Sequence, residues 1–277
     1  MAEIATNRQG AGMEPAKPSP VSSRAIVVAG VAFLLLFVAW IPLYNWFSSL
    51  TGGNELALGI MTAVFWLLVF GVVVAAVAWS RAAFERWDTR DLMLVAVVGA
   101  AFGPLFALWT NIYTFAGGFL GPWNDLVGGF WWLPAILVPY IIRKPGAALV
   151  AETLAALVSV LAGSPYGFVG AALAGLTQGM GAEVVFMLTG WKRYDWLTLS
   201  LAGVASAVTG FVYLWPIYYV GYSTQLLLIT LAAYIIGVLI FAVVGGKLLG
   251  DALLSTGVLN RFAIGRERRQ AAASGEF

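Results

Sequence analysis

Two glutamates lie deep within apolar segments of this chain, where a carboxyl group could bind a ligand or transfer a proton. Glu152 falls six residues after Gly146, and Glu183 falls eight residues before Trp191. A carboxylate at such depth in a bilayer costs on the order of 2.5–3.5 kcal/mol by insertion scales, so it must face protein or water. Small residues share the helical face of each glutamate, which predicts that both faces pack against other helices. A third acid, Asp125, lies near the end of another apolar segment.

The two glutamates admit two interpretations. In the first, each carboxyl group is protonated and makes an interhelical hydrogen bond that stabilises the bundle. In the second, one of them forms a ligand or proton site. The cores of these segments contain no Lys or Arg that could pair with Glu152 or Glu183. A positively charged or amidine-like ligand could supply that missing partner, which favours the second interpretation.

A second group of candidates gathers at segment ends that lack basic residues. Aromatic side chains there form a belt typical of a membrane interface, but aromatic faces also bind organic cations and flat rings. Gln178 adds both a donor and an acceptor for the edge of a heterocycle. The other candidates of this group are Trp131, Trp132, Tyr166, Tyr113, Asn111 and Asn124.

Composition excludes several classes of protein. The chain is 61% hydrophobic and 10% charged, and it contains neither Cys nor His. Disulfides, thiol chemistry, haem ligation by His and the common zinc sites are therefore excluded, and we expect no metal, cofactor or catalytic residue. No Gly-x-x-x-x-Gly-Lys-Ser/Thr run occurs, so any energy from ATP must come from a partner. The net charge of +2 reflects the loops between apolar segments and does not indicate nucleic-acid binding.

The candidate residues are positioned by apolar segments whose joints alternate in charge. A bilayer span needs about 20 apolar residues, and the sequence contains such segments at about 25–47, 56–80, 91–110, 126–142, 146–162, 167–190, 196–219 and 225–249. All 15 basic residues fall before the first segment, in every second joint, or at and after the end of the last segment. The joints 48–55, 111–125, 163–166 and 220–224 contain none. Cytoplasmic loops hold Lys and Arg, so the pattern predicts an all-α, eight-span protein in a lipid bilayer with both termini cytoplasmic.

The polar joints divide the chain into four parts. We expect a disordered cytoplasmic tail at 1–23, a transmembrane hairpin at 24–87, a six-helix module at 88–254 and an interfacial tail at 255–277. The module carries small residues at four-residue spacing, such as Ala96 and Ala100, and Gly175 and Gly179. Such steps let helix backbones approach closely in lipid. They serve either internal packing or the docking of a separate membrane subunit.

From Asp91 to about Leu254 the chain resembles the YkoE family, substrate-binding (S) components of energy-coupling-factor (ECF) vitamin transporters. The most specific similarities are the runs Ile142-Arg143-Lys144-Pro145-Gly146-Ala147-Ala148 and Gln178-Gly179-Met180-Gly181-Ala182-Glu183. Further similarity lies in Gly128-Gly129-Phe130-Trp131-Trp132, Ala151-Glu152, Gly163-Ser164-Pro165-Tyr166-Gly167 and Arg193-Tyr194-Asp195. The N-terminal hairpin falls outside the resemblance.

The resemblance implies a six-helix subunit in the bacterial cytoplasmic membrane that binds thiamine or its hydroxymethylpyrimidine precursor. It also implies that this subunit functions together with a membrane coupling (T) protein and cytoplasmic ATPases. Ala96 and Ala100 would form the small-residue motif on which the coupling protein docks. We expect a ligand site closed by the 111–125 and 163–166 loops. Glu183 or Glu152 would read the polar edge of an aminopyrimidine there, beside the aromatic and amide candidates.

The alternative function is a self-sufficient proton-coupled carrier with Glu152 and Glu183 as its relay. Such carriers often contain inverted repeats and helices broken near mid-membrane. The sequence shows no internal repeat and no mid-helix Gly-Pro break in the last four segments, which counts against this alternative. A membrane-embedded enzyme is more distant, since carboxylates and tyrosines alone would have to perform its catalysis.

Overall fold

The computed structural model describes residues 23–79 and 87–274, and every regular element in these ranges is helical. Five helical stretches are long and apolar enough to cross a membrane: Thr89–Trp123, Asp125–Ile142, Gly167–Leu188, Trp196–Tyr218 and Thr224–Ser255. Two shorter apolar helices cover Glu55–Gly71 and Ala147–Leu161. An all-helical membrane protein is thus confirmed, whereas the count of eight spans stays a prediction. The predicted tail at 1–23 lies almost wholly outside the described residues.

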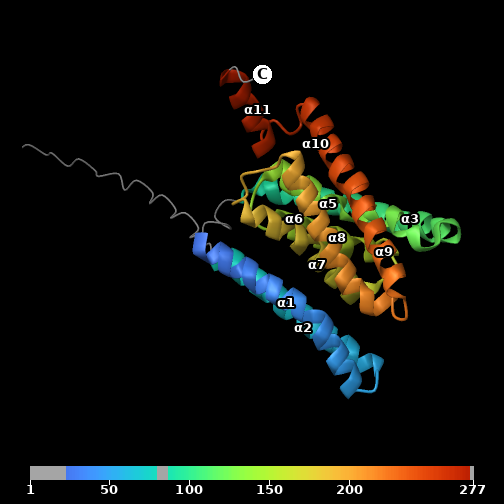
Figure 1. Cartoon of the computed structure of the whole chain (residues 1–277). Helices are drawn as coiled ribbons and strands as arrows, with labels where there is room; N and C mark the ends of the chain where they lie inside the picture. Colours follow the sequence, from blue (N-terminus) through green and yellow to red (C-terminus); the bar gives the residue numbers. More distant parts are fainter. Residues whose placement is uncertain (1–22, 80–86, 275–277) are drawn as a thin grey trace, which may run out of the picture.

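The helices form an N-terminal pair and a larger bundle that follows it in the chain (Figure 1). The hairpin consists of α1 (Ser23–Leu50) and α2 (Glu55–Trp79). The rest contains α3 (Thr89–Leu120), the short turns η2 (Gly121–Trp123), α4 (Asp125–Gly128) and η3 (Gly129–Trp132), then α5 (Leu133–Ile142), α6 (Ala147–Leu161), α7 (Gly167–Leu188) and α8 (Trp196–Tyr218). It ends with α9 (Thr224–Gly237), the π-helical segment η4 (Val238–Val244), α10 (Gly245–Ser255) and α11 (Ala263–Ser274).

Helix α6 lies at the centre of the module because small residues let its neighbours approach. A Cβ on Gly175 of α7 would come within 2.7 Å of the Thr153 Cα, and one on Gly179 within 2.8 Å of the Leu149 Cα. On the other side, a Cβ on Gly99 of α3 would meet the Leu154 side chain at 2.7 Å. Internal packing therefore explains the Gly175–Gly179 step. These contacts fix α6, which carries Glu152, between α3 and α7.

Helix boundaries around 111–132 differ from the expectation. Residues 111–120, predicted as part of a loop, continue α3, and the predicted helix at 126–142 is divided into α4, η3 and α5. Asn111 lies within α3, and its side-chain amide donates to the carbonyls of Ala107 and Leu108 in the same helix. The division follows from a close crossing, since a Cβ on Gly129 would overlap the backbone of Gly237.

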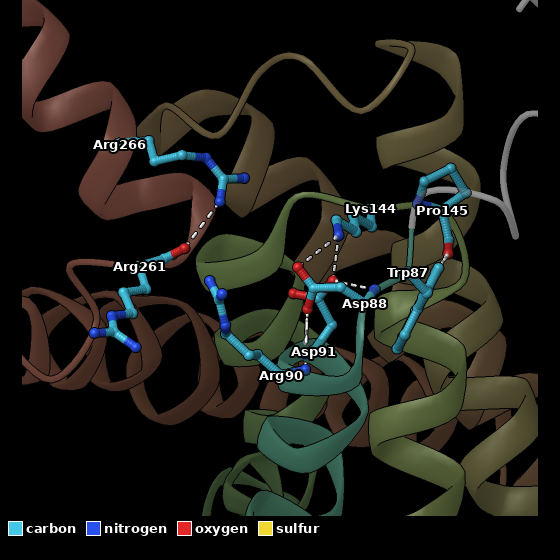
Figure 2. A network of polar contacts seen from close by, with 8 residues as sticks. All are labelled: Trp87, Asp88, Arg90, Asp91, Lys144, Pro145, Arg261 and Arg266. Carbon is cyan, nitrogen blue, oxygen red and sulfur yellow. Dashed lines mark hydrogen bonds and ion pairs between the residues drawn. The ribbon is translucent and has the colours of Figure 1, made fainter. Parts of the chain in front are cut away.

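The basic joints meet at one end of the bundle. Lys144 pairs with Asp91 at the start of α3, and the Trp87 indole donates to the Pro145 carbonyl at 2.9 Å, as Figure 2 shows. Arg143 pairs with Glu267 of α11. Hydrogen bonds from backbone N–H groups, first that of Asp91, hold the pKa of Asp88 below its ordinary value as it caps α3. The positive-inside rule predicts that this end is cytoplasmic.

The N-terminal hairpin packs beside α7 and α8 (Figure 1). Its buried side chains include Trp40 and Trp66, which are 0% and 1% exposed. The two indoles lie 5.7 Å apart, and Tyr44 reaches Trp215 of α8 at 6.1 Å between ring centroids. Aromatic burial thus joins the hairpin to the module.

Candidate functional site

A cavity of about 340 Å³ opens among α3, η3, α6, α7, α8 and α9, toward the end opposite the basic joints. This volume falls within the range of small-molecule sites. Most of its lining is aromatic or small: Phe106, Tyr113, Trp131, Trp132, Glu152, Ala156, Ser159, Ser164, Tyr166, Gly170, Ala171, Ala174, Gln178, Tyr213, Leu214, Ile217, Tyr218, Tyr219 and Tyr234. Six of the predicted ligand-binding residues line it together: Glu152, Gln178, Trp131, Trp132, Tyr166 and Tyr113.

Among the described residues that line the cavity, Glu152 is the only acid, and one of its carboxylate oxygens has no hydrogen-bond partner. The side chain is 0% exposed, and its Oε2 accepts a hydrogen bond of 3.0 Å from the Ala135 N–H in the first turn of α5. The first N–H groups of a helix have no partner within the helix, so a carboxylate there is stabilising. Its Oε1 is buried without a hydrogen-bond partner. Such a group costs about 1–3 kcal/mol unless something satisfies it.

Glu183 is equally buried but lies outside the cavity lining. Its Oε1 accepts from the Gly146 N–H at 2.6 Å and from the Trp191 indole at 2.7 Å. Its Oε2 accepts from the Ala148 N–H at 3.1 Å. Both oxygens are therefore used, and the carboxylate caps the N-terminus of α6 near the basic joints. This arrangement fits the structural interpretation of Glu183.

Hydrogen bonds hold the aromatic walls in place. The Trp132 indole donates to the Ser206 carbonyl at 3.1 Å, and the Trp131 indole donates to the Phe106 carbonyl at 3.4 Å. Trp131 lies 4.9 Å from Tyr113 and meets Tyr166 edge-on at 6.1 Å between ring centroids. These rings present flat apolar faces whose orientation is fixed before a ligand enters.

Three tyrosines gather around Asp125, and of these four residues only Tyr113 was predicted as part of the site. Asp125 Oδ1 accepts hydrogen bonds from the Tyr113 hydroxyl at 2.6 Å and the Tyr219 hydroxyl at 3.2 Å. The Tyr219 and Tyr234 hydroxyls lie 3.0 Å apart. All three tyrosines line the cavity, while Asp125 is 4% exposed behind them. The sequence places Asp125 at a segment end but contains no signal that Tyr219 and Tyr234 converge on it.

The remaining candidates lie elsewhere. Asn111 is exposed on α3 and bonds its own helix, and Asn124 follows η2 with its Oδ1 buried and unpartnered; neither lines the cavity. Ala96 and Ala100 are exposed on α3, beside Leu92, Met93 and Val97, which are 57–63% exposed. This face of α3 is therefore uncovered in the isolated chain.

Comparisons with known proteins agree with this architecture. The family model described as the permease component of an ABC-type cobalt transport system matches residues 90–209. YkoE of Bacillus subtilis (strain 168), which carries the provisional name of an HMP/thiamine permease protein, is 38% identical over 188 residues, 67% of this chain and 94% of that protein. The crystal structure of an S component of an ECF transporter superposes with a TM-score of 0.64 at 37% identity, covering 69% of this chain and 98% of the other.

The relatives are transporter subunits, not enzymes, and the likeness extends over nearly their whole length. It also agrees with the motifs around Arg143–Ala148 and Gln178–Glu183, which in this structure build the α6 N-terminus and its Glu183 cap. The chain therefore belongs to the YkoE family of S components of energy-coupling-factor transporters.

Proposed function

We propose that the chain binds thiamine in the cavity as the substrate-binding subunit of an ATP-driven importer. The observation that carries this proposal is the unpartnered Oε1 of Glu152, buried at a cavity with aromatic walls. The exocyclic amine of an aminopyrimidine would donate to this oxygen. Hydrogen bonds to charged groups contribute about 1.5–3 kcal/mol. Trp131, Trp132 and Tyr166 would pack against the ring, and Gln178 would supply a donor or acceptor.

The tyrosine cluster favours thiamine over hydroxymethylpyrimidine, because thiamine also contains a cationic thiazolium ring. Of the described residues that line the cavity, none is Lys or Arg. Asp125 accepts hydrogen bonds from Tyr113 and Tyr219, and its carboxylate would contribute a negative charge at that wall. Tyrosine faces attract organic cations by their ring quadrupoles. A neutral precursor would gain nothing from this wall, and a phosphate ester would be repelled by both carboxylates.

Partner docking would use the exposed face of α3. Ala96 and Ala100 let another helix approach closely. Pro104 has no N–H, so the carbonyl of Ala100 has no helical donor four residues later. A membrane coupling protein that packs on this face would shield that carbonyl from lipid and could provide a donor. ATP hydrolysis would then occur on cytoplasmic partners.

Calorimetry on the purified full chain tests the ligand assignment. We expect thiamine to bind more tightly than hydroxymethylpyrimidine, and thiamine phosphate to bind least. Equal affinity for thiamine and its phosphate would contradict the electrostatic argument. Reconstituted alone, the chain should bind thiamine without accumulating it. Uptake driven only by a proton gradient would instead support the carrier hypothesis.

A further inference from the structure

The hairpin meets α8 at a point where α8 lacks a backbone hydrogen bond. Pro216 lies inside α8 and has no N–H, so the carbonyl of Val212, four residues earlier, has no helical donor. An unsatisfied carbonyl is costly inside a membrane protein, where water is scarce. The Trp40 indole of α1 donates to this carbonyl at 3.2 Å, and the bond is buried. Trp40 therefore replaces the donor that Pro216 removes.

The same end of α8 forms one wall of the cavity. The residues that follow Val212 and line the cavity are Tyr213, Leu214, Ile217, Tyr218 and Tyr219. Tyr213 contacts the hairpin as well, because its ring meets Trp66 edge-on at 6.3 Å between centroids. A proline that interrupts a helix weakens the turn around it. The cavity wall is thus the part of α8 that most needs an external support.

We propose that the hairpin, through Trp40, positions the cavity-lining end of α8 and thereby sets the affinity for ligand. Trp40 is a positioning residue, since it does not line the cavity. The family match begins only at residue 90, so the hairpin lies outside it. The identity of the ligand rests on the function proposed above, whereas the support of α8 by Trp40 rests on geometry alone.

A matched pair of variants separates the hydrogen bond from aromatic packing. Trp40→Phe keeps a ring but removes the donor that Val212 uses. Trp66→Phe is the control, because the Trp66 Nε1 is buried without any partner in the described structure. Pro216→Ala restores an N–H four residues after Val212, so adding it to Trp40→Phe should rescue the protein.

Two readouts are measured on the full chain in detergent: amide hydrogen exchange across 212–219 without ligand, and thiamine affinity by calorimetry. We expect Trp40→Phe to speed exchange and to weaken thiamine binding, each by about ten-fold, or about 1.4 kcal/mol. Trp66→Phe should change neither, and Pro216→Ala should reverse both changes.

The proposal would be overturned if amide hydrogen exchange across 212–219 in Trp40→Phe were as slow as in the wild-type chain. It would also be overturned if adding Pro216→Ala failed to restore the wild-type values. Faster exchange with unchanged thiamine affinity would overturn the link to ligand binding. If even the wild-type chain fails to bind thiamine, the proposed ligand is wrong, and the exchange data alone still decide whether Trp40 supports α8.

Discussion

Glu152 and Glu183 occupy two regions that look alike in sequence and differ in structure. Both are 0% exposed, and each accepts hydrogen bonds from the N-terminus of a neighbouring helix. Near the basic joints, three donors use both oxygens of Glu183. At the cavity, Glu152 has one donor and one unpartnered oxygen.

The difference shows that two equally buried carboxylates can have different numbers of hydrogen-bond partners. A buried carboxylate whose oxygens are all bonded stabilises the fold, since its desolvation is already compensated. A buried carboxylate with one unpartnered oxygen at a cavity is stabilised when a ligand donates a hydrogen bond to that oxygen. We therefore propose that the number of satisfied lone pairs, rather than depth, separates a structural role for Glu183 from a ligand-binding role for Glu152.

The largest effect should come from Glu183→Gln. The amide loses the charge that three donors share and places an NH₂ group where an acceptor is needed. Hydrogen bonds to charged groups contribute about 1.5–3 kcal/mol each, so we expect the free energy of unfolding to fall by on the order of 3 kcal/mol. Thermal unfolding in detergent measures this change. Thiamine affinity of the folded fraction should change little, and a loss confined to affinity would reverse the roles of the two glutamates.

Glu152→Gln should produce the opposite pattern. We expect thiamine affinity to fall ten-fold or more, or at least about 1.4 kcal/mol, because the ligand amine loses a charged acceptor. The Ala135 N–H can still donate to the Gln oxygen, so thermal stability should change less than in Glu183→Gln. Calorimetry and thermal unfolding of both variants test the comparison directly. If both bind thiamine as tightly as wild type, both carboxylates are structural.

Asp125→Asn should reduce selectivity more than stability. The amide oxygen can still accept from Tyr113 and Tyr219, but the negative charge behind the tyrosine wall is lost. We expect thiamine to lose about five-fold in affinity, roughly 1 kcal/mol, while hydroxymethylpyrimidine changes little. Competition binding measures the ratio. An equal loss for both ligands would show that Asp125 only orders the tyrosines.

The exposed face of α3 that we propose for docking lies away from both glutamates, so substitutions there should leave the surroundings of Glu152 and Glu183 unchanged. Ala96→Trp combined with Ala100→Trp should abolish co-purification of the coupling protein. Thiamine affinity should stay within about two-fold of wild type, and the free energy of unfolding within about 0.5 kcal/mol. Unchanged co-purification would assign the contact to another helix face.

Topology decides which glutamate region faces outward, and testing it should perturb the protein least. The native chain contains no Cys, so single cysteines can be introduced cleanly. Val220→Cys, at a joint near the cavity, should react with an impermeant thiol reagent outside the cell. Lys192→Cys, near Glu183, should react only after the membrane is opened. External labelling of Lys192→Cys would refute the predicted orientation.

The sequence by itself determined the all-helical class of the chain and its apolar environment, but not the bounds of every helix. Apolar length predicted membrane helices, and small residues predicted close packing, as at Gly175 and Gly179 against α6. The motifs at Arg143–Ala148 and Gln178–Glu183 indicated the family, which the comparisons confirm. These inferences hold because spacing along one helix fixes which residues share its faces.

Only the tertiary structure decided how those faces meet. It separated Glu152 from Glu183, brought Tyr219 and Tyr234 to Asp125, and set Trp40 against the Val212 carbonyl. It also extended α3 through residues 111–120, where polar side chains bond their own helix. Periodicity gives the orientation of each side chain about its own helix axis, but contacts between helices depend on the register and crossing of separate segments, which no single segment encodes.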